Sequence, residues 1–167
     1  MPRPVISVVL LLGACSFGFS GGGLPPGIKT VAVDECLNST ADPGIAQFVR
    51  TGVKQAMESR LGLRAASESQ ADALVHCTIT RYDPDQPEVF TSTPGASGAA
   101  NQVNVSQRHV DLMADITVIE QKTGKTLWDG RAQTASGTYT TGHETDGRQK
   151  ALDLLIKRLI DGVHANW

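Results

Sequence analysis

The side chains that could carry out chemistry are few and scattered. No two of the four histidines have the i, i+4 spacing that places two imidazoles on one metal ion: His76, His109, His143 and His164. Asp83 and Asp85 flank Pro84, and a proline between two carboxylates is typical of a turn. No serine or aspartate nucleophile is paired with an ordered histidine. We therefore expect no catalytic residue, no cofactor and no metal, and a chain that is not an enzyme.

Cys15 has the most specific surroundings of any residue. Arg3 and the apolar run that ends at Leu12 have the layout of a secretory signal peptide. Leu12-Gly13-Ala14-Cys15 then resembles a bacterial lipobox, so we expect residues 1–14 to be removed and Cys15 to carry the lipid anchor. An ordinary signal peptide with an incidental cysteine is the alternative. Ser16, in place of Asp, after the cysteine favours the outer membrane.

Two further cysteines remain once Cys15 is lipidated. Cys36 and Cys77 form an even pair in an oxidising compartment, and they stand at the two ends of a predicted strand-helix-strand unit. They are either joined in a disulfide or are two small buried thiols. A disulfide requires the two strands to be neighbours.

The composition favours one globular domain and disfavours nucleic-acid binding. The chain is 40% hydrophobic and 19% charged, and 15 Lys and Arg against 17 Asp and Glu leave a net charge of -2 with no excess of basic residues. Residues 15–27 are rich in Gly and Pro and uncharged, which predicts a flexible tether. Residues 28–167 are then a single domain.

Hydrophobic periodicity predicts the elements of that domain. Alternating or β-rich patterns predict strands, and three-and-four spacing predicts helices. A strand is expected over 28–34, a helix from Asp42-Pro43 to about Leu61 with Gly62 as its left-handed end, and a strand over 72–82. The Pro- and Gly-rich residues 83–101 have no periodicity and predict a long loop.

The second half of the chain predicts a hairpin followed by a helix. Strands are expected over 103–120 and 126–139, joined by a tight turn at 122–125, and a helix over 146–163. The apolar phase changes between Val105 and Val110, which predicts a bulge near residues 106–109. The order β-α-β-β-β-α predicts an α+β fold with two helices packed on one face of a four-stranded mixed sheet. The other face is open and semi-polar: His76, Thr78, Thr80, Asp111, Asp115 and Thr117.

The order of several segments resembles a known family. The lipobox is followed by SFGFSGGGLPPGIKTVAV, by an Asn38-Ser39-Thr40 turn before Asp42-Pro43-Gly44, by ADALVHCTITRYDPD and by KTGKTLWDG. Together these segments resemble the LptE-like lipopolysaccharide-assembly lipoproteins over nearly the whole mature chain. Cys36 and Cys77 depart from that pattern, because the family has an aromatic residue and a glycine there; a local staple is one explanation.

The resemblance implies a non-enzymatic function at the outer membrane. Members of the family lie in the lumen of the LptD β-barrel, help it to assemble, and help lipopolysaccharide to reach the outer leaflet. The partners implied are therefore an LptD-like barrel, lipopolysaccharide and the membrane that holds the lipid anchor, with the domain facing the periplasm or inside the barrel. The predicted strands carry three arginines that are either contacts for anionic sugar phosphates or ordinary solvated side chains: Arg81, Arg108 and Arg131. A periplasm-facing scaffold or binding module of another transport assembly is the alternative function.

Overall fold

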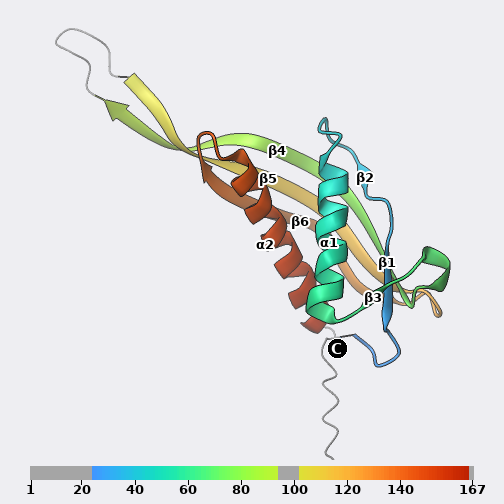
Figure 1. The fold of residues 1–167 in the computed structure, drawn as a ribbon. Coiled ribbons are helices and arrows are strands. Elements are labelled where there is room, and N and C mark those ends of the chain that lie inside the picture. The colour runs from blue at the N-terminus through green and yellow to red at the C-terminus, as the bar shows by residue number, and fades with distance from the viewer. Residues whose placement is uncertain (1–23, 94–101, 166–167) are drawn as a thin grey trace, which may run out of the picture.

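The computed structural model describes residues 24–93 and 102–165, and these form an α+β fold (Figure 1). The predicted signal peptide, Cys15 and most of the predicted tether lie outside the described residues. In chain order the elements are β1 (Thr30–Val33), β2 (Leu37–Asn38), α1 (Ile45–Leu61), β3 (Arg64–Ala65), the 3-10 turn η1 (Glu68–Gln70), β4 (Ala73–Thr93), β5 (Gln102–Glu120), β6 (Thr126–Thr140) and α2 (Glu144–Ala165).

The strands form one mixed sheet in the order β3-β1-β4-β5-β6, with β2 also beside β4. β1 pairs in parallel with β3 and β4, and β2 pairs in parallel with β4, whereas β4, β5 and β6 are antiparallel. β1 and β4, the two strands of the predicted strand-helix-strand unit, are neighbours in the sheet. The prediction of four strands is wrong: the described residues form six, because β2 and β3 have two residues each and are too short to show an alternating pattern.

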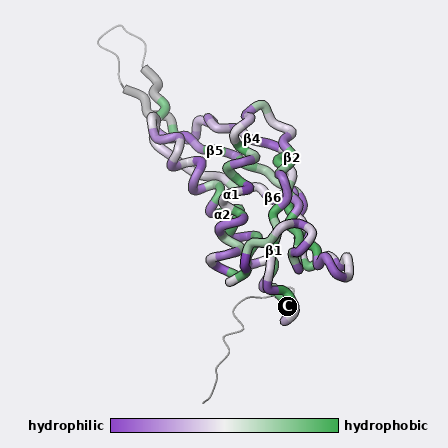
Figure 2. Tube along the Cα trace, turned by 45° about the vertical axis from the view of Figure 1, so that its right-hand side comes forward, coloured by the Kyte–Doolittle hydropathy of each residue, from purple (hydrophilic) through white to green (hydrophobic). Residues whose placement is uncertain are grey.

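Both helices cover the same face of the sheet, where the core lies (Figure 1). Alternate residues of the central strands point into this core, among them Val75, Ile79, Leu112 and Ile116, all fully buried. The helices contribute an apolar stripe at three-and-four spacing that packs on them. Figure 2 shows the result as hydrophobic and hydrophilic residues interleaved along the helices and strands of the body.

The two ends of α1 show one confirmed prediction and one error. Gly62 has φ 67° and the Leu63 N–H donates to the Met57 carbonyl over 3.3 Å, as the predicted left-handed ending requires. The predicted start at Asp42-Pro43 is wrong, because the helix begins at Ile45. Asp42 instead accepts a hydrogen bond from the Gly44 N–H at 2.8 Å, so it caps the turn that precedes the helix.

The segment predicted as a loop over 83–101 is largely strand. β4 continues to Thr93 and pairs with β5 down to Thr93 opposite Gln102; only 94–101 lie outside the described residues. Pro84 and Pro87 fit because β2 ends beside Ile79, which leaves this part of β4 at the sheet edge, and register shifts flank both prolines. The predicted bulge near 106–109 is confirmed: Val89 pairs with Gln107 and Phe90 with Val105, so Ser106 between them has no partner on β4.

A second bulge shapes β6. β5 residues 114 and 116 pair with Gln133 and Gly130, so two residues of β6 face Asp115 alone. One of them, Ala132, has φ 49°, and its N–H donates to the Asp115 carboxylate at 2.6 Å. The carboxylate therefore holds a left-handed conformation that alanine rarely adopts.

α2 packs so closely on β6 that glycine is required at the contact. α2 begins at Glu144, two residues earlier than predicted, and its buried Gly147 faces Gly137 of β6. A Cβ atom at Gly137 would lie 1.9 Å from the Gly147 carbonyl oxygen. This contact holds the N-terminal end of α2 against the sheet.

Candidate functional site

A two-stranded arm is the most distinctive surface feature of the described residues. We define the hairpin arm as residues 83–93 of β4 and 102–109 of β5. The pairing of β5 with β6 ends at Gln107 and Thr140, whereas the pairing of β4 with β5 continues to Thr93 and Gln102. Figure 1 shows the outer part of the arm, past the last pair with β6, leaving the body beyond both helices, with no helix over it.

A tyrosine of β6 holds the base of the arm to the sheet. The Tyr139 hydroxyl lies 2.8 Å from the Pro84 carbonyl oxygen and 3.1 Å from the Asp85 carboxylate, with the tyrosine ring buried. Arg108 of β5 forms an ion pair with the same Asp85 carboxylate. This hydrogen-bonded guanidinium is the main reason why the pKa of Asp85 is lowered, with Tyr139 contributing. Burial is the main cause of the raised pKa of Tyr139.

A second clamp joins the arm to both helices. Arg148 of α2 lies between two aromatic rings, 5.8 Å from the Phe48 centroid and 5.4 Å from that of Tyr82. Its Nε donates to the Tyr82 hydroxyl at 2.8 Å, and its Nη2 lies 3.4 Å from the Asp42 carboxylate. Tyr82 directly precedes the arm, so this contact ties the start of the arm to both helices. Burial raises the pKa of Tyr82.

The three predicted contact arginines do not form one site. Arg108 lies on the arm, and Arg81 lies on β4 just before the arm. The strand partner of Arg81 is Met113, which is five residues from Arg108 along β5. Arg131 lies on the bulge of β6. Each is paired with a nearby aspartate: Arg81 with Asp83, Arg108 with Asp85 and Arg131 with Asp129. Contact of these arginines with lipopolysaccharide stays a prediction.

The uncovered face of the sheet carries acidic and hydroxyl groups as predicted. Asp83 of β4 stands opposite Asp111 of β5, and Asp111 in turn accepts a hydrogen bond from the Ser136 hydroxyl. His109 lies 3.4 Å from the Asp111 carboxylate and 4.0 Å from that of Glu88. These groups make the base of the arm polar on this face.

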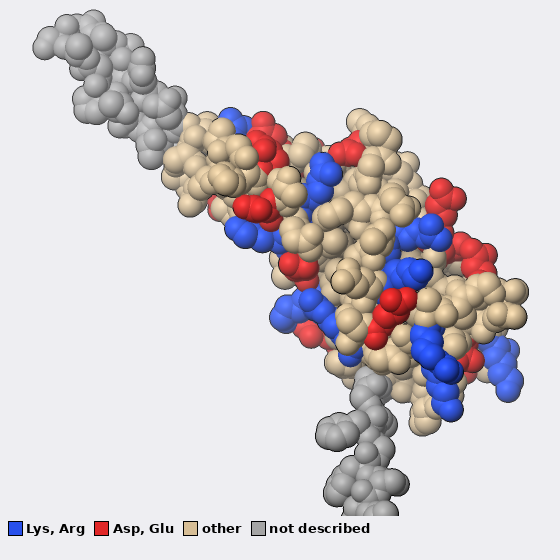
Figure 3. Space-filling view, in the orientation of Figure 1, with Lys and Arg blue, Asp and Glu red and all other residues tan. Residues whose placement is uncertain are grey.

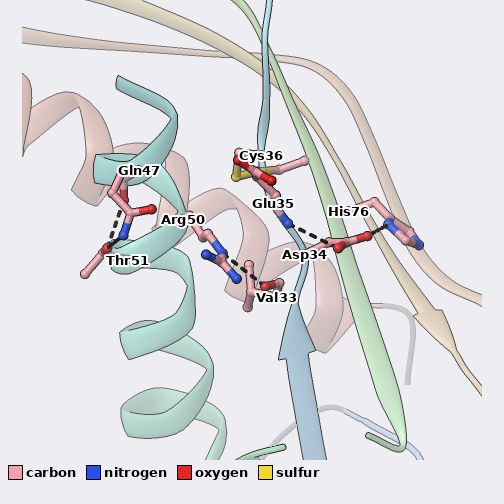
Figure 4. The surroundings of a disulfide bond; sticks show 9 residues. Val33, Asp34, Glu35, Cys36, Gln47, Arg50, Thr51 and His76 are labelled. Carbon is pink, nitrogen blue, oxygen red and sulfur yellow. Dashed lines mark hydrogen bonds and ion pairs between the residues drawn. A yellow bond between two sulfur atoms is a disulfide. The ribbon is translucent and has the colours of Figure 1, made fainter. Parts of the chain in front are cut away.

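Cys36, between β1 and β2, and Cys77, in the part of β4 that lies in the body, are joined in a disulfide (Figure 4). Their Cα atoms are 4.7 Å apart and both side chains are buried. Next to the disulfide, Asp34 accepts a hydrogen bond from His76 Nδ1 at 2.9 Å. The disulfide therefore connects the segment after β1 directly to β4.

Within residues 24–93 and 102–165, no group of three His, Cys, Asp or Glu side chains is arranged to hold a metal ion. Neither helix in that part of the chain is long and apolar enough to cross a membrane.

Sequence reasoning missed the residues that hold the arm. Arg148 and Tyr82 are 66 residues apart, and Tyr139 is 55 residues from Pro84, so no local pattern connects them. The available signal was weak: Tyr82 is the last residue of a predicted alternating strand, and Arg148 occurs in the first turn of a predicted apolar helix.

No family model and no curated protein matches the chain. Solved structures resemble it at low identity. The hypothetical protein CT253 from Chlamydia trachomatis shares 8% identity at a TM-score of 0.50, over 83% of this chain and 99% of that one. Lipoprotein GNA1162 from Neisseria meningitidis shares 14% at 0.45, over 83% and 99%. The PelC dodecamer subunit from Paraburkholderia phytofirmans shares 18% at 0.45, over 84% and 92%.

The likeness to CT253 supports the fold alone. The other two are too weak to carry an argument about function.

Proposed function

We propose that this chain is a non-enzymatic, lipid-anchored protein of the bacterial outer membrane that inserts its hairpin arm into an LptD-type β-barrel. In this proposal it helps the barrel to assemble and lipopolysaccharide to reach the cell surface. The observation that carries the proposal is the arm itself. An isolated two-stranded hairpin is marginally stable in water, so an arm that leaves its own sheet gains most when a partner covers it.

The base of the arm is largely polar, which suits a barrel interior. Its described side chains include Asp83, Asp85 and Glu88 with Arg108 and His109, all exposed or half-buried, beside the exposed Val89. The interior of a transmembrane barrel is polar, so these groups lose little hydration there. The lipobox resemblance at Cys15 supports the anchor, and the LptE-like order of segments supports this class of partner.

Crosslinking from two matched positions tests the proposal. A photo-reactive residue at Gln107 of the arm should crosslink to a β-barrel in native membranes. The same residue at Gln55, which is exposed on α1, should crosslink less. If neither position ever crosslinks to a barrel, the barrel proposal is wrong, and a scaffold of another transport assembly takes its place.

Shortening the arm tests the docking surface separately. Replacing residues 90–106 by Asn-Gly joins the paired residues Val89 and Gln107 through a two-residue turn. The shortened protein should melt at nearly the same temperature, because the clamps at Tyr82 and Tyr139 remain, and it should capture much less barrel. Full capture by a folded shortened protein would show that the arm is not the docking surface.

A further inference from the structure

A basic groove lies on the side of the body away from the arm. We define the α1–β1 groove as the concavity of about 760 Å³ between α1, the β1 edge and η1. Figure 3 shows basic side chains running down the face between α1 and β1, with acidic ones among them. The groove volume is within the usual range for small-molecule sites.

Two cations one helical turn apart face this groove. Arg50 and Lys54 of α1 both line it. Arg50 reaches across to β1, where its Nε donates to the Val33 carbonyl oxygen at 3.2 Å (Figure 4). That bond fixes the guanidinium and leaves its two terminal nitrogens available. Among the described residues, neither Arg50 nor Lys54 takes part in an ion pair.

The opposite wall supplies hydroxyl groups and one carboxyl group. Ser67 and Ser69 line the groove with their oxygens 3.4 Å apart. Glu68 lies between them in sequence, and it is the one acidic residue of the lining. Hydrogen bonding and repulsion from the Asp34 carboxylate raise the pKa of Glu68, while the pKa of Asp34 is lowered. The charged side chains of the lining are two basic and one acidic, so the lining carries one positive charge in excess, and the Asp34 carboxylate lies outside it.

We propose that the α1–β1 groove binds a phosphomonoester, with Arg50 and Lys54 balancing the dianion and the serine hydroxyls donating to its oxygens. The number of charges favours this group over a carboxylate, because a phosphomonoester carries -1.5 to -2 at neutral pH and a carboxylate carries -1. The fork of a fixed guanidinium matches two phosphate oxygens at once. The proposal is independent of the hairpin arm and of the barrel.

Calorimetric titration of the full-length chain in a nonionic detergent tests the site, with glycerol 3-phosphate as the probe. Arg50→Gln and Lys54→Gln should each weaken binding about tenfold, since each removes a charged hydrogen bond. Arg60→Gln is the matched control: it removes the same charge from α1, but Arg60 lines a different groove, between α1 and α2. Glu68→Gln should tighten binding severalfold by removing the opposing carboxyl group.

Several outcomes decide between alternatives. Detergent micelles that carry phosphatidic acid present the same phosphomonoester on a lipid. Binding to these micelles but not to glycerol 3-phosphate assigns the groove to a lipid headgroup. Binding to both probes assigns it to free phosphomonoesters. Acetate that binds as tightly as glycerol 3-phosphate, with the same dependence on Lys54, would overturn the phosphate assignment. Absence of binding, or an equal effect of Arg60→Gln, would overturn the site. If Arg50→Gln melts early, Lys54→Gln decides, because its side chain is exposed.

Discussion

Removing the Cys36–Cys77 disulfide should lower the free energy of unfolding by about 4 kcal/mol. The bond closes a loop of sequence separation 41, which contains β2, α1, β3 and η1. The loop-entropy relation for that length gives roughly 13 cal/mol/K, or about 4 kcal/mol at 25 °C. Hydrogen bonds such as that from the Asp34 N–H to the Val75 carbonyl oxygen, 3.0 Å long, keep the two segments together without the bond. The effect should therefore arise mainly in the unfolded chain.

Urea unfolding with and without a reductant measures this effect. With a slope of about 2 kcal/mol/M, reduction should move the midpoint down by about 2 M. The double variant Cys36→Ala/Cys77→Ala should unfold near the reduced midpoint and should not respond to reductant. Alkylation of the denatured, unreduced protein should modify neither Cys36 nor Cys77.

Two results would refute the reasoning. Alkylation of both cysteines without reductant would show that the bond is absent from the protein. Equal midpoints with and without reductant, at an unchanged slope, would show that the closed loop does not limit the unfolded chain.

Four further predictions concern separate parts of the molecule. Gly137→Ala should cost at least about 2 kcal/mol in chemical unfolding, because the new Cβ would collide with the Gly147 carbonyl oxygen. Arg148→Met keeps an apolar stem but loses the hydrogen bond to the Tyr82 hydroxyl and the two cation–π contacts. The free energy of unfolding from thermal melts should fall by about 1–2 kcal/mol. The pKa of Asp72 is lowered, chiefly by the hydrogen bond from the Lys29 N–H, so its contribution is present above the unfolded pKa of about 4 and is lost as pH falls through the lower folded pKa. Asp72→Asn should therefore destabilise the protein by about 1 kcal/mol at pH 7 and by less at pH 3, as urea midpoints at the two pH values will show. Cys15→Ala should leave a soluble or unprocessed protein on membrane fractionation, and a mature Cys15→Ala protein that stays with membranes would contradict the anchor.

The predicted fold was right where a long periodic pattern specified an element. α1, α2 and the main strands each bury a continuous apolar face, so their residue types carry the information. β2 and β3 escaped prediction because two residues cannot show a period. The arm was not predicted because prolines such as Pro84 and Pro87 are excluded from central strands and so indicated a loop. They lie at a sheet edge, which tolerates both.

The surface features were harder to predict than the fold. The pairing of Cys36 with Cys77 depended on β1 and β4 being neighbours, which the strand-helix-strand order made a reasonable expectation. The Arg148 clamp and the α1–β1 groove depend instead on side chains from elements distant in sequence. Only the i, i+4 spacing of Arg50 and Lys54 could be seen in advance, and such spacing is common on solvated helices.

The bulge of β6 and the prolines of the hairpin arm affect how the protein behaves at high concentration. An uninterrupted strand edge is a template on which other chains can polymerise. In β6 the left-handed Ala132 interrupts the regular strand conformation. The Lys150 ammonium donates a hydrogen bond to the Thr138 carbonyl oxygen at 2.9 Å, so that acceptor is already used. In the arm, Pro84 and Pro87 have no N–H group to donate to a further strand. Strand-to-strand aggregation is therefore disfavoured along β6 and beside the two prolines of the arm, where a partner has side chains more than backbone to recognise.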